Sequence, residues 1–345
     1  MRRLLPTLAV AVTVLSACGA DGRYAALDDI PPPSAAPAQT QDASPGTYTV
    51  DCGRNEARHL NADNVVIAPG QPNGAHHTHE YIGNRTTTHT STDETLAAGT
   101  TTCTNGDLST YYWPVLRLLD RPGHDAHAPG GGAHGNTGEV LPPAKVVVRY
   151  TGSPVSPVVP LPRFTRLITG DATAGTAASG GSGAGTPSDA TPADSDPADS
   201  DPASAGGSGA GAGARAASAA TGVVRWGCEG VAGWIDRYPL CEGRRVVRGF
   251  EFPSCWDGRN IDSASHRAHV QFPASNGVCP AGTFPVPRLE IHVFYDVPAG
   301  RPYAIDSFPE QERDPRTDHA MGVNVMPDHV MAEVAGCLNA GRQCP

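Results

Sequence analysis

The cysteines place the strongest limit on how this chain can fold. Of nine, Cys18 closes an apolar N-terminal segment, and eight lie further along: Cys52, Cys103, Cys228, Cys241, Cys255, Cys279, Cys337 and Cys344. An even number in an exported chain is typical of disulfides. We expect Cys52–Cys103 and Cys228–Cys241 as local pairs and leave the other connections open. The alternative, a zinc–thiolate site, is disfavoured because the sequence has no C-x-x-C.

The first residues predict export. Arg2 and Arg3 precede an apolar run from Leu4 to Leu15 that is too short to span a bilayer. Leu15-Ser16-Ala17-Cys18 matches the bacterial lipobox, which implies a signal peptide over 1–17 and lipidation of Cys18. A plain signal peptide with a chance cysteine is the alternative. We expect an extracytoplasmic protein that touches the membrane only through this lipid anchor, with residues 18–46 as a disordered tether.

Composition favours a loop-rich β protein. The chain has 40 Gly and 33 Pro among 345 residues, and only 39% are hydrophobic. Its formal charge of −10, with Lys145 as the only lysine, argues against nucleic acid as a partner. A neutral polysaccharide or cell-wall glycan, or a metal cation, fits this charge better.

We predict a single, mainly β domain over 47–345, a β-sandwich or jelly-roll-like fold with a few short helices, stapled by disulfides. The expected strands are 64–69, 145–150, 223–226, 244–252, 268–272 and 289–295, and a helix is expected over 327–338. The sequence GGSGAG occurs at 180–185 and again at 206–211, so 170–220 is predicted to be a disordered, low-complexity insertion. A Gly-rich loop over 123–138 is interpreted as a tolerated insert.

Histidines supply the candidate metal ligands. His77 and His79 are two apart and therefore project from one face of a strand. With His292 and His319 they are the predicted ligands of zinc or copper. Carboxylates that could orient the rings are Glu80, Asp257, Asp262 and Asp318. Two alternatives stay open: a metal-free polar cleft lined by histidines, and purely structural hydrogen bonds.

A second candidate site lies between Phe252 and His269. Asp257, Asp262, His266 and His269 are the predicted acid, base or catalytic groups. Trp256, Trp113 and Asn260 are the predicted ligand-binding residues, with the tryptophans as stacking platforms for sugar rings. The alternative for the Cys255-Trp256-Asp257-Gly258 run is structural: a disulfide, a packed indole and a tight turn.

The run FPSCWDGRNIDSASHRAH at 252–269 is very similar to the signature of DUF1996, a secreted family of unknown function from actinobacteria and filamentous fungi. His77-Thr78-His79, Tyr112-Trp113-Pro114 and Cys279-Pro280 resemble further motifs of that family. The resemblance implies one domain with the low-complexity stretch inserted, and a role near polysaccharide. The chain departs from the family's H-A-D-F-x-N-G-W pattern, because Met321 and Met326 replace its Asp and Trp.

Two functions follow as hypotheses. The first is a carbohydrate- or envelope-directed enzyme with a histidine-lined, metal-binding cleft. The second is a non-catalytic module of the cell envelope that binds glycan or serves a structural role. The sequence alone does not decide whether the protein is an enzyme.

Overall fold

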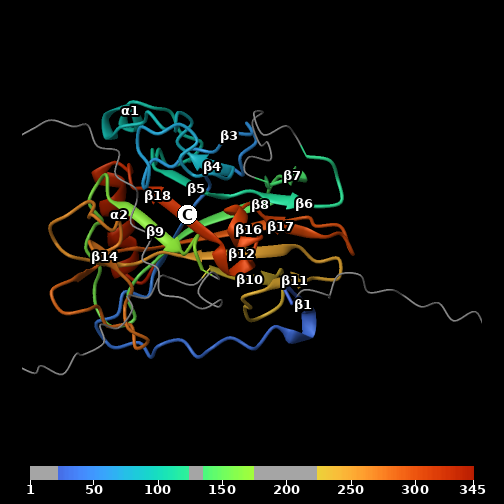
Figure 1. The fold of residues 1–345 in the computed structure, drawn as a ribbon. Coiled ribbons are helices and arrows are strands. Elements are labelled where there is room, and N and C mark those ends of the chain that lie inside the picture. The colour runs from blue at the N-terminus through green and yellow to red at the C-terminus, as the bar shows by residue number, and fades with distance from the viewer. Residues whose placement is uncertain (1–21, 124–134, 175–223) are drawn as a thin grey trace, which may run out of the picture.

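A computed structural model describes residues 22–123, 135–174 and 224–345. Within these ranges the chain is mainly β, with strands in several sheets and two α-helices (Figure 1). Among the same residues, no helix has the length and apolar character needed to cross a membrane. The predicted insertion over 170–220 lies almost wholly outside the described residues, as do the signal peptide, Cys18 and most of the Gly-rich loop.

The larger sheet has six strands in the order β10-β12-β16-β8-β2-β19. Its members are β10 (Val224–Cys228), β12 (Val246–Glu251), β16 (Arg288–Tyr295), β8 (Lys145–Thr151), β2 (Thr47–Val50) and β19 (Gln343–Cys344). All neighbours pair antiparallel except β19, which lies parallel to β2. The helix α2 (Asp328–Asn339) leads into β19, close to the predicted helix over 327–338.

The second sheet has five strands in the order β3-β4-β5-β18-β9, all antiparallel. They are β3 (Leu60–Asn61), β4 (His79–Gly83), β5 (Thr110–Pro114), β18 (His319–Val323) and β9 (Arg166–Gly170). The first residues of β4 and β18 therefore start at the same end of the sheet, on either side of β5. This register brings together residues 240 positions apart in sequence.

The two sheets pack face to face as a β-sandwich. Trp113 of β5 stacks on Phe250 of β12 at 5.9 Å between ring centroids, and the hydroxyls of Tyr111 and Tyr150 lie 2.7 Å apart. These side chains belong to the main hydrophobic core. Because strand side chains alternate, the other face of the five-stranded sheet points away from the sandwich interior.

That outer face carries a second, smaller core. Tyr81, Tyr112 and Met321 project from β4, β5 and β18 and pack with Val65 and Val66. The short helix α1 (Asp93–Ala97) adds Leu96. Both faces of the five-stranded sheet are thus buried, and polar side chains on either face must find internal partners.

Smaller elements complete the fold. The remaining strands are β1 (Tyr24–Ala26), β11 (Tyr238–Leu240), β6 (Leu116–Leu118), β7 (Glu139–Leu141), β17 (Tyr303–Ile305), β13 (Cys255–Trp256), β14 (Val270–Gln271) and β15 (Phe284–Pro285). They form a parallel β1-β11 pair and two three-stranded sheets, β17-β6-β7 and β14-β13-β15. Single-turn 3-10 helices lie at Leu27–Asp29, Pro309–Gln311 and Pro315–Thr317.

All eight cysteines after Cys18 form disulfides: Cys52–Cys103, Cys228–Cys241, Cys255–Cys279 and Cys337–Cys344. Both predicted local pairs are confirmed. The last disulfide closes the end of α2 onto β19, and the third closes the small sheet around β13.

Two local expectations differ from the structure. The β-branched run over 64–69 forms turns, not a strand, because the side-chain oxygen of Asn64 accepts the backbone N–H groups of Val66 and Ile67.

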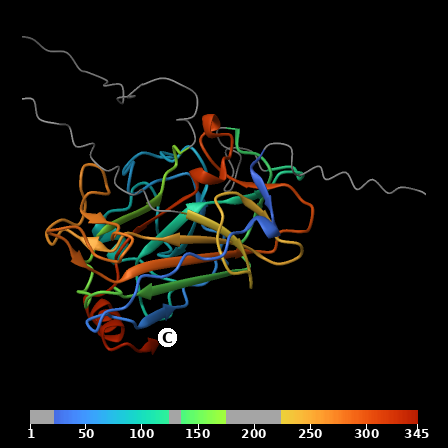
Figure 2. The same cartoon turned by 90° about the horizontal axis from the view of Figure 1, so that it is seen from below.

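The segment expected to be a disordered tether over 18–46 is, from Gly22 onward, packed against the domain: β1 pairs with β11, and Ala25 and Ile30 are buried. Figure 2 shows this N-terminal segment, in blue, running along the six-stranded sheet.

Candidate metal centre

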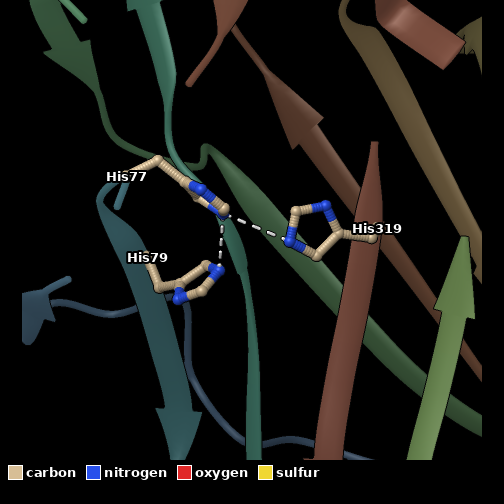
Figure 3. A group of neighbouring side chains, drawn as sticks. All are labelled: His77, His79 and His319. Atoms are coloured by element: carbon tan, nitrogen blue, oxygen red, sulfur yellow. Dashed lines mark hydrogen bonds between the residues drawn. The ribbon is translucent and has the colours of Figure 1, made fainter. Parts of the chain in front are cut away.

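Three imidazoles converge on the outer face of the five-stranded sheet (Figure 3). The Nε2 atom of His77 lies 3.0 Å from Nε2 of His79 and 3.2 Å from Nε2 of His319. All three ligand nitrogens lie within 4.8 Å of one another, and the three residues are buried. We call these residues the histidine cluster.

The sheet register explains the convergence. His79 is the first residue of β4 and pairs with Pro114 of β5, while His319 is the first residue of β18. Tyr112 of β5 pairs with Tyr81 on one side and with Met321 on the other. Since each of these partners is two residues beyond a histidine, the two rings sit at the same level on the same face. His77 reaches them from the segment just before β4.

The hydrogen bonds of the rings fix which nitrogens face inward. Nδ1 of His79 lies 3.0 Å from the carbonyl oxygen of Asp63, and Nδ1 of His319 lies 2.9 Å from that of Thr317. A carbonyl oxygen only accepts, so both Nδ1 atoms carry the proton and donate it. Both Nε2 atoms then present lone pairs to His77.

Burial keeps the three rings neutral. It lowers the pKa of His79 to about 3, with the charge of His319 acting in the same direction. Burial also lowers the pKa of His77 well below its ordinary value, helped by His79, His319 and His76. The pKa of His319 is lowered by burial as well, against the Thr317 carbonyl and Asp318. Neutral imidazoles are the form that binds metal ions.

Two buried ion pairs hold the strands that carry the cluster. Arg117 pairs with Asp306, whose Oδ2 accepts the backbone N–H of Thr78 between the two histidines at 3.2 Å. Arg248 pairs with Asp318 at 2.5 Å, and Asp318 also accepts the N–H of His319 at 2.9 Å. Both arginines are fully buried. Sequence reasoning missed these arginines, since nothing local distinguishes a buried arginine from a surface one.

The cluster fits a divalent transition metal ion. Tetrahedral zinc with Zn–N bonds of about 2.0–2.1 Å places its nitrogen ligands about 3.3 Å apart, close to the 3.0 and 3.2 Å contacts of His77. Without an ion, His77 has one proton to offer two facing lone pairs. Its own Nδ1 is buried with no hydrogen bond of regular geometry, although the Ala75 backbone acts against burial to raise the pKa of the ring. A cation relieves both problems, because Nδ1 can then carry the proton.

The fourth predicted ligand lies elsewhere. His292 is in β16 of the other sheet, and its ring is 5.4 Å from that of Trp234. The structure therefore groups His77, His79 and His319 and leaves His292 out. The predicted orienting carboxylates also differ, since the ring N–H groups of His79 and His319 donate to backbone carbonyls. Glu80 points to the opposite face of β4, where its Oε1 accepts from Trp113 at 2.6 Å and Tyr295 at 2.5 Å.

The predicted site over 252–269 forms a separate cluster. His266 Nδ1 lies 2.9 Å from Asp262 Oδ1, and His269 makes its contacts with Ser263 and the Arg166 carbonyl. Asp257 accepts the backbone N–H groups of Arg259 and Asn260, both at 2.9 Å, and the Asn260 amide. Burial acts to raise the pKa of Asp257, but the hydrogen bonds from Asn260 and Arg259 outweigh it and the pKa is lowered. This favours the turn-forming interpretation of Asp257 and Asn260.

The tryptophans behave differently from each other. Trp113 is fully buried between the sheets, so the prediction that it is a sugar-stacking platform is wrong. Trp256 is partly exposed, donates Nε1–H to the carbonyl of Asn260 at 2.7 Å, and pairs with the exposed Phe284 across β13 and β15.

Phe308 is a further residue that the sequence did not single out. Its ring lies 5.4 Å from that of His77. It also lines a surface cavity of about 280 Å³, together with Asn136, Ser307 and Arg313. Phe308 thus touches both the histidine cluster and a space reached from solvent.

Comparison with known proteins gives one match. The family model for the domain of unknown function DUF1996 matches residues 64–322, a span that includes the whole histidine cluster and the 252–269 segment. No curated protein and no solved structure matches the chain.

Proposed function

Because the chain belongs to the DUF1996 family, whose description states no activity, we propose its function from the geometry of the histidine cluster. The protein is a metal-dependent enzyme that holds a divalent transition ion, zinc or copper, through His77, His79 and His319. The observation that carries this proposal is the approach of three buried imidazoles, with Nε2 of His77 at 3.0 Å from that of His79 and 3.2 Å from that of His319, and all three ligand atoms within 4.8 Å of one another.

A three-histidine set supports catalysis better than a purely structural role. Structural zinc sites are closed by four protein ligands, whereas catalytic ones use three and keep a position open. When bound, such an ion supplies Lewis acidity and activates water near neutral pH. The chain's own contribution is to hold the rings: Asp63 and Thr317 fix two of them through backbone carbonyls, and Asp306 and Asp318 fix the strands.

The site of action follows from the sequence and is part of the proposal. The lipobox around Cys18 supports a lipid-anchored protein outside the cytoplasm, near polysaccharide or cell-wall glycan. The cavity at Phe308 is the proposed approach for substrate, since Phe308 also contacts His77. Its Arg313 carries a guanidinium that can hydrogen-bond hydroxyls and carboxylates of a glycan.

The test is metal binding followed by activity. Chelator-treated protein is titrated with Zn²⁺ and Cu²⁺ by calorimetry, and bound metal is counted by elemental analysis. One ion per chain is expected, with Cu²⁺ the tighter of the two. His319→Ala should lose binding at least tenfold, whereas His292→Ala is the matched control and should bind like the parent. Equal binding by all three proteins would refute the centre.

A second candidate function rests on a different surface. Phe284 is 51% exposed beside Trp256, and both belong to the small sheet β14-β13-β15. Exposed aromatic rings stack on sugars, so a non-catalytic glycan-binding module is the alternative. Retained binding to insoluble cell-wall glycan in His319→Ala, with loss in Trp256→Ala, would favour that module over the enzyme.

A further inference from the structure

The 252–269 segment contains a serine–histidine contact that the metal centre does not use. Oγ of Ser263 lies 3.1 Å from Nδ1 of His269, and Nε2 of His269 lies 2.8 Å from the carbonyl oxygen of Arg166. The carbonyl can only accept, so Nε2 carries the proton. Nδ1 of the neutral ring is then an acceptor, and the Ser263 hydroxyl donates to it.

The environment keeps His269 neutral and able to take a proton. The residue is 1% exposed. Burial lowers its pKa, while the Arg166 carbonyl, Asp262 and Asp257 oppose this and His266 adds to it. A nucleophile, a base within hydrogen-bond reach and a third group that orients the base are the three parts of an activated serine.

The segment is held rigidly against β9, as a catalytic pair requires. The backbone N–H of Arg166 donates to the carbonyl of Ile261 at 2.9 Å, and Arg267 donates to the carbonyl of Gly170 at 2.7 Å. These contacts secure the segment at both ends of the strand. Further back, the Cys255–Cys279 disulfide fixes its start.

The backbone of this turn is strained where it supports the pair. His266 has φ of +52°, a left-handed conformation that a non-glycine residue seldom adopts. Its ring is held by Asp262 at 2.9 Å. The turn brings the backbone N–H of Ala268 to 3.1 Å from Ser263 Oγ, which holds the hydroxyl in place beside His269. Strain of this kind gathers at functional sites.

We propose that Ser263 is a nucleophile, that His269 is its general base oriented by the Arg166 carbonyl, and that the pair cleaves carboxylic esters. Ser263 is only half-buried, so the expected substrate is an accessible ester with a small acyl group. An ester suits this pair because its alcohol leaves more readily than an amine.

The step balances without a co-reactant other than water. Ser263 Oγ forms a bond to the acyl carbon as its proton moves to His269 Nδ1. The ester C–O bond breaks and the alcohol departs with that proton. Water then gives a proton to Nδ1 as its oxygen bonds to the acyl carbon. The bond between that carbon and Ser263 Oγ breaks, and Oγ takes the proton back from Nδ1, which releases the carboxylic acid and restores the serine. Removing metal from the histidine cluster should not affect this sequence, since neither residue belongs to it.

The experiment uses a fluorophosphonate, which reacts covalently with activated serines. The exported chain should gain one adduct by intact mass, and peptide mapping should place it on Ser263. Ser265→Ala is the matched control: Ser265 lies in the same turn and accepts N–H groups, but among the described residues it has no histidine partner. Labelling should persist in Ser265→Ala and disappear in Ser263→Ala.

His269→Gln tests the base and guards against a folding artefact. It should keep the fold, judged by circular dichroism, and label at least a hundredfold more slowly. Labelling and hydrolysis of a p-nitrophenyl acetate probe should survive chelation, which separates this activity from the metal centre. An unlabelled Ser263 in folded protein, or equal labelling of His269→Gln, would overturn the proposal.

Discussion

His79 and Glu80 are neighbours on β4, yet they lead into two buried polar clusters of opposite character. On the inner face, Glu80 joins Trp113, Tyr295, Arg248 and Asp318 in what we call the interior network. There, each charged group has partners of the complementary kind. On the outer face, the histidine cluster has one His77 proton for two facing acceptors, the Nε2 atoms of His79 and His319.

The difference shows how a structural polar cluster can be told from a ligand-binding one in a buried site. A network in which every donor has an acceptor stabilises the fold and has no free group to bind a ligand. A cluster with facing lone pairs and an unsatisfied Nδ1 is costly by itself and becomes favourable once a cation fills it. The two clusters share strands, so the interior network also sets the geometry of the cluster.

The largest expected effect comes from breaking the interior network. Arg248→Ala leaves the Asp318 carboxylate buried without its partner, which should lower the free energy of unfolding by about 3–5 kcal/mol. His77→Ala leaves no buried charge without its partner, so in metal-free protein it should cost no more than about 2 kcal/mol. Urea unfolding of both variants in chelator measures the contrast. Equal losses of unfolding free energy in the two variants would mean that the histidine cluster is as important for stability as the interior network.

Metal addition should show the reverse contrast. An ion that binds only the folded state adds about 2.7 kcal/mol of stability at a free concentration of a hundred times its dissociation constant. Unfolding in the presence of Zn²⁺ should show this gain for the parent and for His292→Ala. His77→Ala and His319→Ala should gain about 1.4 kcal/mol or less at the same ion concentration, because their affinity falls at least tenfold. A full gain in His77→Ala would place the ion outside the cluster.

The histidine cluster and the interior network should change the stability of the protein with pH in opposite directions. The unfolded chain protonates its histidines near pH 6.5, while burial holds the folded pKa of His79 at about 3. Acid therefore favours unfolding: the stability due to His79 is complete above pH 6.5 and declines as pH falls toward 3. The slope is about 1.4 kcal/mol per pH unit for each histidine that behaves this way. Metal-free protein unfolded in urea at several pH values measures it.

Glu80 contributes the opposite slope. Burial raises its folded pKa to about 7, against hydrogen bonds from Tyr295 and Trp113 and the charge of Arg248, whereas the unfolded value is 4.5. Its stability contribution is present below pH 4.5 and declines as pH rises to 7. Glu80→Gln removes this term, so between those values its stability should rise with pH more steeply than the parent's, by up to about 1.4 kcal/mol per pH unit. An unchanged slope would contradict the raised pKa.

The sequence predicted the frame of the molecule well and the site in part. Cysteine parity and spacing identified two disulfides, and β-branched runs located β8 and β16. The H-x-H spacing placed two rings on one side of the chain because His79 opens β4. It could not place His319 beside them, since that depends on strand register around β5, or exclude His292, which has the same alternating pattern in the other sheet. The strand predicted over 64–69 is wrong because the Asn64 side chain forms a turn with the backbone, although three β-branched residues follow it.

The smallest expected effect concerns Met321, where the resemblance to the family leads us to expect an acidic residue. Met321 lies on the outer face two residues after His319, and its sulfur is 3.4 Å from the Tyr112 hydroxyl. Met321→Leu conserves volume and should cost less than about 1.5 kcal/mol. Since three imidazoles suffice to hold the ion, metal affinity should change less than threefold in calorimetry. A loss of tenfold or more for Cu²⁺ but not for Zn²⁺ would show that the thioether is a fourth ligand, because soft sulfur favours copper.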